Sequence, residues 1–132
     1  SSSRKRDKAK YFLVLRPKDR KTAILKLTIT VPEHFKASIK PRKLSLCRMQ
    51  LGGMLEKTKC LEKIPAVIEV SEDQKTIDVF PDKPVSTEGS VAVVMKIFNP
   101  RKRGMFQFNA LVQAPGDVPM AGYVGSWNID IN

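Results

Sequence analysis

The chain is poor in the residue types that most enzymes and metal sites need. It has one histidine, His34, and two cysteines, Cys47 and Cys60, in 132 residues. A catalytic triad or a metal cluster would have to centre on His34, and such sites need several partners. No Cys or His spacing matches a zinc site, and Gly52-Gly53 lacks the further glycines and the Lys-Ser/Thr of a phosphate-binding loop. We therefore expect a protein that is not an enzyme and has no cofactor and no metal.

Long hydrophobic runs are also missing. A membrane-spanning helix needs roughly 18 or more apolar residues in a row, whereas a run such as residues 91–95 has only the length of a strand. Residues 1–6, Ser-Ser-Ser-Arg-Lys-Arg, contain no hydrophobic stretch and do not resemble a secretory signal peptide. Their composition is that of the end of an organelle transit sequence or of a simple basic tail. We expect no transmembrane span, so any membrane contact should be peripheral.

Two cysteines are too few to indicate a disulfide framework. Cys47 falls in a β-like run and is expected to be a small core residue, because free cysteine is among the most buried residue types. A Cys47–Cys60 bridge across the Gly52-Gly53 turn is the alternative. The sequence does not decide between them, so it leaves the redox compartment open.

Periodicity of two dominates the chain. In residues 21–31, Leu25, Leu27, Ile29 and Val31 alternate with polar side chains until Pro32, which predicts a half-buried strand. Further β-like runs cover residues 11–15, 44–51, 66–70, 75–80, 91–98, 105–112 and 123–131, and residues 33–40 are expected to hold a short helical turn. Seven or eight short strands with frequent turn signals predict an all-β protein, an antiparallel β-sandwich. We expect a basic flexible arm at residues 1–10 and one β-sandwich domain at residues 11–132.

Acidic residues are scarce in the first fifty positions. Residues 1–50 hold fifteen Lys and Arg against three Asp and Glu, while residues 51–132 hold nine against ten, which together give the net charge of +11. Concentrated charge of one sign attracts polyanions and costs self-repulsion without a partner. The residues expected to bind such a partner are Arg4, Lys5, Arg6, Lys8, Lys10, Arg16, Lys18, Arg20, Lys21, Lys40, Arg42, Lys43 and Arg48, with Arg101, Lys102 and Arg103 on a separate hairpin tip.

Exposed aromatic residues that could stack on bases are few near these charges. Only Tyr11, Phe12 and Phe35 are available, and Tyr11-Phe12 fits a core strand better than a stacking platform. An acidic protein or an anionic membrane face needs only the charges. We therefore favour an acidic protein assembly as the partner, with peripheral contact to anionic lipid as a further option and nucleic acid less favoured.

The last third of the chain carries a family resemblance. Asn99-Pro100, Gly104, Phe106 and Phe108, then Ala114-Pro115-Gly116, Tyr123-Val124-Gly125, Ile129 and Ile131, form a turn, an aromatic strand, a Pro/Gly loop and a closing strand. This pattern resembles domain of unknown function 2808, a family of cyanobacteria and plastid-bearing eukaryotes. The resemblance covers roughly residues 22–131 and leaves the basic front outside the family pattern. Each shared residue has a structural role in turns or core, so no catalytic residue can be carried over.

The resemblance implies a photosynthetic setting. Combined with the basic front, it predicts a non-catalytic accessory or linker protein that docks onto a light-harvesting antenna or photosystem. The expected location is the plastid, on the stromal side of the thylakoid membrane, with a cyanobacterial cell as the alternative. The alternative function is an organellar nucleic-acid-binding protein, associated with ribosomes or the nucleoid. A third is a carbohydrate-binding or enzymatic sandwich, which would need an exposed Trp127 beside an acidic cleft.

Overall fold

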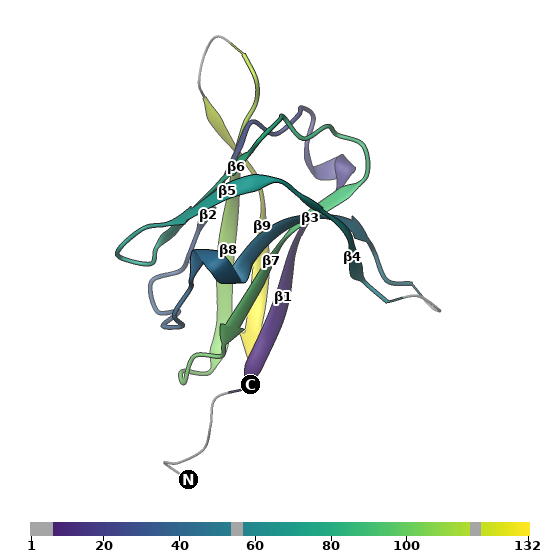
Figure 1. Ribbon diagram of the computed structural model, residues 1–132. Coiled ribbons are helices and arrows are strands. Elements are labelled where there is room, and N and C mark those ends of the chain that lie inside the picture. Colours follow the sequence, from purple (N-terminus) through teal and green to yellow (C-terminus); the bar gives the residue numbers. More distant parts are fainter. Residues whose placement is uncertain (1–6, 54–56, 117–119) are drawn as a thin grey trace.

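The computed structural model describes residues 7–53, 57–116 and 120–132, and these residues form a sandwich of two antiparallel sheets (Figure 1). One sheet has four strands, in the order β1 (Lys8–Leu15), β7 (Ser90–Phe98), β3 (Leu44–Gln50) and β4 (Lys59–Ile64). The other has five strands, in the order β5 (Ala66–Val70), β6 (Thr76–Pro81), β2 (Lys26–Thr30), β8 (Gly104–Gln113) and β9 (Ala121–Ile131). Two short 3-10 helices, η1 (Pro17–Asp19) and η2 (Pro41–Lys43), lie in the connections. The predicted all-β sandwich is confirmed.

Alternating side chains from both sheets fill the space between them. Leu27 and Ile29 of β2, Ile77 and Val79 of β6, and Phe108 of β8 are at most 1% exposed. Their partners in the other sheet include Leu13, Val91, Val93 and Met95, which belong to the same cluster. Strands β2, β6 and β8 bury one face, as the period-two pattern predicts, whereas residues 91–95 of β7 are buried on both faces.

A second, smaller cluster lies on the outer face of the four-stranded sheet. Cys47, Met49, Ala92 and Val94 are buried there and pack with Phe12 among other side chains. Cys47 and Cys60 form a disulfide in this cluster, with a Cα–Cα distance of 5.5 Å. Cys47 is therefore both a core residue and a bridged one, and the bond ties the edge strand β4 to β3.

The two sheets are joined at both of their long edges. At one edge, Pro65 alone separates β4 from β5, so the chain passes from one sheet to the other with a single-residue break. At the other edge, the Trp127 indole of β9 donates a hydrogen bond of 2.8 Å to the carbonyl oxygen of Val14 on β1. Trp127 is half-buried, so the exposed tryptophan that a carbohydrate-binding sandwich would need is not present.

Three expectations need correction. Strand β1 begins at Lys8, so Lys8 and Lys10 belong to the sheet and not to a flexible arm; residues 1–6 of the expected arm lie outside the described residues. Residues 33–40 hold no helix but one hydrogen-bonded turn at residues 33 and 34, in which the N–H of Phe35 donates to the carbonyl of Pro32 at 3.1 Å. Beyond this turn, the Gln74 side chain accepts from the N–H of Ile39 at 2.7 Å and donates to its carbonyl at 3.1 Å. Strand β4 was not expected, because its sequence does not alternate between apolar and polar residues and most of its side chains are exposed. It is a strand because its backbone pairs with β3.

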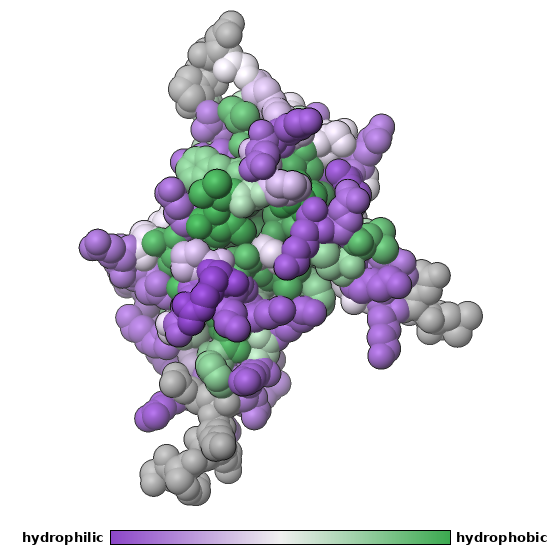
Figure 2. Space-filling model, in the orientation of Figure 1, coloured by the Kyte–Doolittle hydropathy of each residue, from purple (hydrophilic) through white to green (hydrophobic). Residues whose placement is uncertain are grey.

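On the face shown in Figure 2, hydrophilic side chains lie around and between patches of apolar surface. The large apolar side chains that are more than half exposed are Leu61, Val67, Phe98, Met105, Met120 and Tyr123. They lie on five different strands, except Met120, which precedes β9. Within the described part of the chain, no helix is long and apolar enough to cross a bilayer.

Candidate functional site

A groove of about 530 Å³ lies where β1, β7 and the segment leading into β3 meet. Five lysines line it: Lys8, Lys10, Lys40, Lys43 and Lys96. The other lining residues are Ala9, Ser38, Ile97 and Phe98, so none of the described lining residues is acidic. We call this feature the lysine groove.

Strand register brings these lysines together from distant parts of the chain. Lys10 lies directly opposite Lys96, and Lys8 lies opposite Phe98. On the other side of β7, Leu44 pairs with Met95, which brings the preceding Lys43 close to Lys96. Sheet pairing thus places lysines from three segments side by side.

The 3-10 helix η2 and its N-cap residue supply the fourth and fifth lysines, Lys43 and Lys40. Pro41 starts it, and the N–H of Lys43 donates a hydrogen bond of 2.9 Å to the carbonyl of Lys40. Side chains three positions apart eclipse one another in a 3-10 helix. Lys40 and Lys43 therefore face the same side, toward the groove.

Aromatic rings support two of the lysines. The Lys8 Nζ lies 5.6 Å from the centroid of the Phe98 ring, and the Lys10 Nζ lies 5.5 Å from that of Phe12. A cation over a ring face gains about 0.5–1 kcal/mol at exposed sites. Phe98 remains 52% exposed, so the groove offers an open aromatic surface as well as charge.

No carboxylate in the part of the chain that the structure describes forms an ion pair with a groove lysine. Among the described residues, the ion pairs are Lys26–Asp78 at 3.7 Å and Lys75–Glu33 at 2.6 Å, and neither includes a groove lysine. Lys75 lowers the pKa of Glu33 by its hydrogen bond and its charge. Glu33 therefore pairs with Lys75 and not with a groove lysine. Like charges directly across a strand pair, as in Lys10 and Lys96, destabilise a sheet. An anionic partner would relieve this repulsion, which destabilises the free protein.

The turn predicted to be a hairpin tip lies at the same end of the sandwich as the groove, but it is not a hairpin, because β7 and β8 belong to different sheets. Arg101, Lys102 and Arg103 are exposed in the turn between β7 and β8. The N–H of Asn99, at the start of this turn, donates a hydrogen bond of 2.8 Å to the carbonyl of Asp7. In Figure 1 this turn and the start of β1 lie together at the lower end of the molecule.

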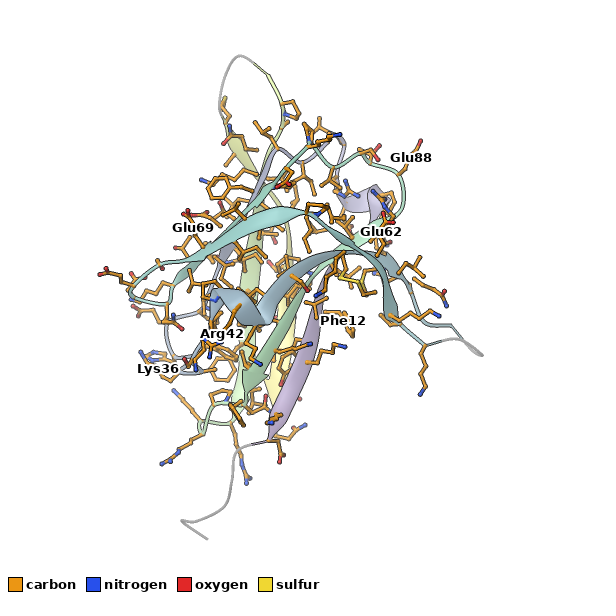
Figure 3. All side chains as sticks on the ribbon, viewed as in Figure 1. Phe12, Lys36, Arg42, Glu62, Glu69 and Glu88 are labelled. Carbon is orange, nitrogen blue, oxygen red and sulfur yellow. A yellow bond between two sulfur atoms is a disulfide. The ribbon has the colours of Figure 1, made fainter. Side chains whose placement is uncertain are left out.

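Arg42 belongs to the same end, but it does not line the groove. It is exposed on η2, and in Figure 3 it lies with Lys36 at the lower left. Glu88, near the other end of β7, lies at the upper right of the same view. Positive charge therefore continues from the groove around this end of the molecule.

Three more of the residues expected to bind a partner lie at the opposite end of β1 from the groove. Arg16, Lys18 and Lys21 follow the far end of β1 and are exposed there. An eight-residue strand spans roughly 25 Å at about 3.3 Å per residue, a separation well beyond a Debye length of about 8 Å at physiological salt. These residues and the lysine groove cannot act as one electrostatic site.

Arg20 was predicted to bind a partner, but it is a structural residue. It is 4% exposed, and its guanidinium donates to the carbonyls of Ser86 at 2.7 Å and Gly89 at 3.0 Å. Burial lowers the pKa of Arg20, and the charge of Arg48 lowers it further. Arg48 is half-buried and donates to the carbonyl of Glu88 at 2.7 Å. Both arginines hold the loop before β7 in place.

We expect Arg20→Met to lower the free energy of unfolding by about 2 kcal/mol, because two carbonyls lose a charged donor. Urea denaturation followed by circular dichroism measures this change. Lys21→Met, at the exposed neighbouring position, should change stability by less than about 0.5 kcal/mol. Equal stability of the two variants would show that Arg20 is not structural.

Among the groove residues that sequence reasoning missed, Lys96 and Phe98 add a cation and an exposed aromatic ring. Both lie in a run of apolar residues, and neither belongs to a cluster of charges along the chain. The sequence feature that could have indicated them is the alternation at the end of β7, where exposed Lys96 and Phe98 flank buried Ile97. Only the pairing with β1 reveals that they face Lys8 and Lys10.

His34 is exposed. Among the described residues, no three His, Cys, Asp or Glu side chains come close enough to hold a metal ion. The predicted arginines and lysine at positions 4–6 lie outside the described residues.

The fold and the groove define an antiparallel β-sandwich domain with an unneutralised cationic site at one end. The chain belongs to the family described as protein of unknown function (DUF2808), whose model matches residues 1–131. The basic front is thus inside the family match, contrary to the narrower span expected from the sequence. Comparison with curated proteins gives no match.

One similar solved structure is a collagen-binding domain from a Staphylococcus aureus adhesin. It shares 16% sequence identity with this chain, with a TM-score of 0.44. The similarity covers 92% of this chain and 85% of that one.

Proposed function

We propose that this protein is a non-catalytic docking protein that binds an acidic protein assembly through the lysine groove. The observation that carries the proposal is the set of five lysines around one groove with no acidic residue among the described lining residues. Electrostatic complementarity of this kind speeds encounter and fixes the orientation of a partner.

The type of cation suits a partner surface whose acidic groups are not held in one fixed geometry. Every basic residue that lines the groove is lysine. Arginine presents a rigid fork that matches carboxylates and phosphates bidentately, whereas lysine is a compact charge on a flexible stem. Lysines can therefore adjust to Asp and Glu side chains on a protein surface without a fixed bidentate geometry.

The partner that we propose is an antenna or photosystem assembly, on the basis of the family resemblance. The disulfide bears on the compartment, because disulfides persist mainly in oxidising environments. We therefore propose an oxidising compartment at the photosynthetic membrane in place of the stromal side that the sequence favoured.

Single-stranded nucleic acid is the second candidate. Exposed Phe98 lies between the groove and the basic turn, where it could stack against a base. Nucleic acid binding would show a steep dependence on salt concentration, because phosphate neutralisation releases counterions.

The test compares two labelled probes at low salt, an oligo-aspartate peptide and a single-stranded oligonucleotide of equal charge. We expect the peptide to bind the wild-type protein more tightly. Lys96→Glu should weaken that binding about thirtyfold, since one attraction becomes one repulsion, each worth on the order of 1 kcal/mol. The readout is fluorescence anisotropy.

Lys21→Glu is the matched control, because it makes the same charge change on an exposed lysine at the opposite end. It should weaken peptide binding less than about threefold. Equal losses in both variants would show that net charge and not the groove binds the peptide. Tighter binding of the oligonucleotide would favour the nucleic-acid function.

A further inference from the structure

The turn between β7 and β8 presents apolar and cationic side chains together. Phe98 is 52% exposed at the end of β7, and Met105 is 67% exposed near the start of β8. Between them, Arg101, Lys102 and Arg103 are all exposed. We call residues 98–105 the basic tip.

The basic tip is held in position by the body of the domain. The Tyr11 hydroxyl donates a hydrogen bond of 2.5 Å to Asn99 Oδ1, and the Asn99 N–H donates to the carbonyl of Asp7 at 2.8 Å. Pro100 is buried. The turn therefore does not need to be ordered on binding, which lowers the entropic cost of association.

The tip crosses from one sheet to the other. Phe98 ends a strand of the four-stranded sheet, and Met105 lies in a strand of the five-stranded sheet. The two apolar side chains therefore stand on the two sides of the sandwich end, with the three cations between them along the chain.

This combination matches the chemistry of a membrane interface. Proteins that lie on a bilayer place apolar and aromatic side chains at the headgroup boundary and basic side chains among anionic headgroups. An acidic protein surface would neutralise the three cations, but it has no need of two exposed apolar side chains beside them. We propose that the basic tip docks on an anionic lipid membrane, with Phe98 and Met105 entering the interface and Arg101, Lys102 and Arg103 contacting headgroups.

Acidic residues near the tip do not cancel its charge. Asp130 lies opposite Met105 on β9, and Asp7 precedes β1. The groove lysines Lys8, Lys10 and Lys96 lie on the Phe98 side of the tip. The end of the sandwich that would approach a membrane therefore remains positive.

The test is co-sedimentation of the whole chain with vesicles of phosphatidylcholine and phosphatidylglycerol, and with vesicles of phosphatidylcholine alone. We expect binding to the anionic vesicles only. The triple variant R101S/K102S/R103S should bind roughly a hundredfold more weakly, from about fivefold for each charge near an anionic surface. Met105→Ser should bind roughly tenfold more weakly, because its side chain no longer enters the apolar region.

Matched controls come from the other end of the molecule. Met120 is 72% exposed and precedes β9, whose first residue Ala121 pairs with Gln113 at the far end of the β8–β9 hairpin. Met120→Ser controls for Met105→Ser, and the triple variant R16S/K18S/K21S removes three exposed charges at that same far end. Both controls should bind anionic vesicles within about threefold of the wild type.

Equal loss in the tip and control variants would overturn the proposal, as would absence of binding to anionic vesicles or equal binding to both kinds of vesicle. The result is independent of the proposed groove function. Arg101, Lys102, Arg103 and Met105 do not line the groove, so the tip variants should still bind the acidic peptide.

Discussion

Phe108→Ala is expected to lower the free energy of unfolding by about 4 kcal/mol, the largest effect of any single substitution considered for this protein. Phe108 is 0% exposed, and its ring meets that of Phe35 edge-on at a centroid distance of 4.9 Å. Removing the ring leaves a cavity between the sheets and also removes the aromatic contact.

Phe108→Ala should also affect residues 35–40, the segment that leads from β2 to η2 and the lysine groove. Phe35 also contacts Phe106 edge-on at 5.2 Å, so these two rings of β8 hold the segment that connects β2 to η2. Loss of Phe108 should therefore loosen residues 35–40 as well as the core. Hydrogen exchange of the amides in this segment would detect the local effect.

Phe98→Ala is the matched control, because Phe98 is the same residue type at 52% exposure. Its stability loss should stay below about 1 kcal/mol, since its side chain is already largely in water. Urea denaturation by circular dichroism gives both values. Similar losses in the two variants would contradict the assignment of Phe108 to the central core.

Reduction of the Cys47–Cys60 disulfide is expected to lower the free energy of unfolding by about 3 kcal/mol. The bond closes a loop with a sequence separation of 13, and loop-closure entropy predicts a loss of this size. The bond also anchors β4, which is an edge strand paired only with β3 within the described residues. Amides of β4 should therefore lose their protection from hydrogen exchange first.

The measurement compares urea denaturation of the same chain with and without reductant, so that packing differences between variants do not enter. The double variant C47A/C60A serves as the control and should not respond to reductant. Unchanged stability of the wild type on reduction would show that β4 is held by its strand pairing and not by the disulfide.

Most of the fold could be predicted from local patterns. Leu27 and Ile29 alternate with Thr28 and Thr30, and this alternation is sufficient to assign a strand with one buried face. Strand β4 could not be assigned this way, because its side chains are mostly exposed and its backbone is fixed by hydrogen bonds to β3. The short helical turn expected at residues 33–40 is limited to one hydrogen-bonded turn at residues 33 and 34, and beyond it the Gln74 side chain, distant in sequence, binds the backbone of Ile39.

The sequence by itself determined the sign of the charge, the all-β class and the family, since each depends on composition or on local pattern. Only the tertiary structure decided which cations act together. It joined Lys10 to Lys96 across β1 and β7, buried Arg20 under the loop before β7, and separated Arg16, Lys18 and Lys21 from the groove by the length of a strand. The physical reason is that Coulomb interactions depend on distance in space, and strand pairing sets that distance between residues far apart in the chain.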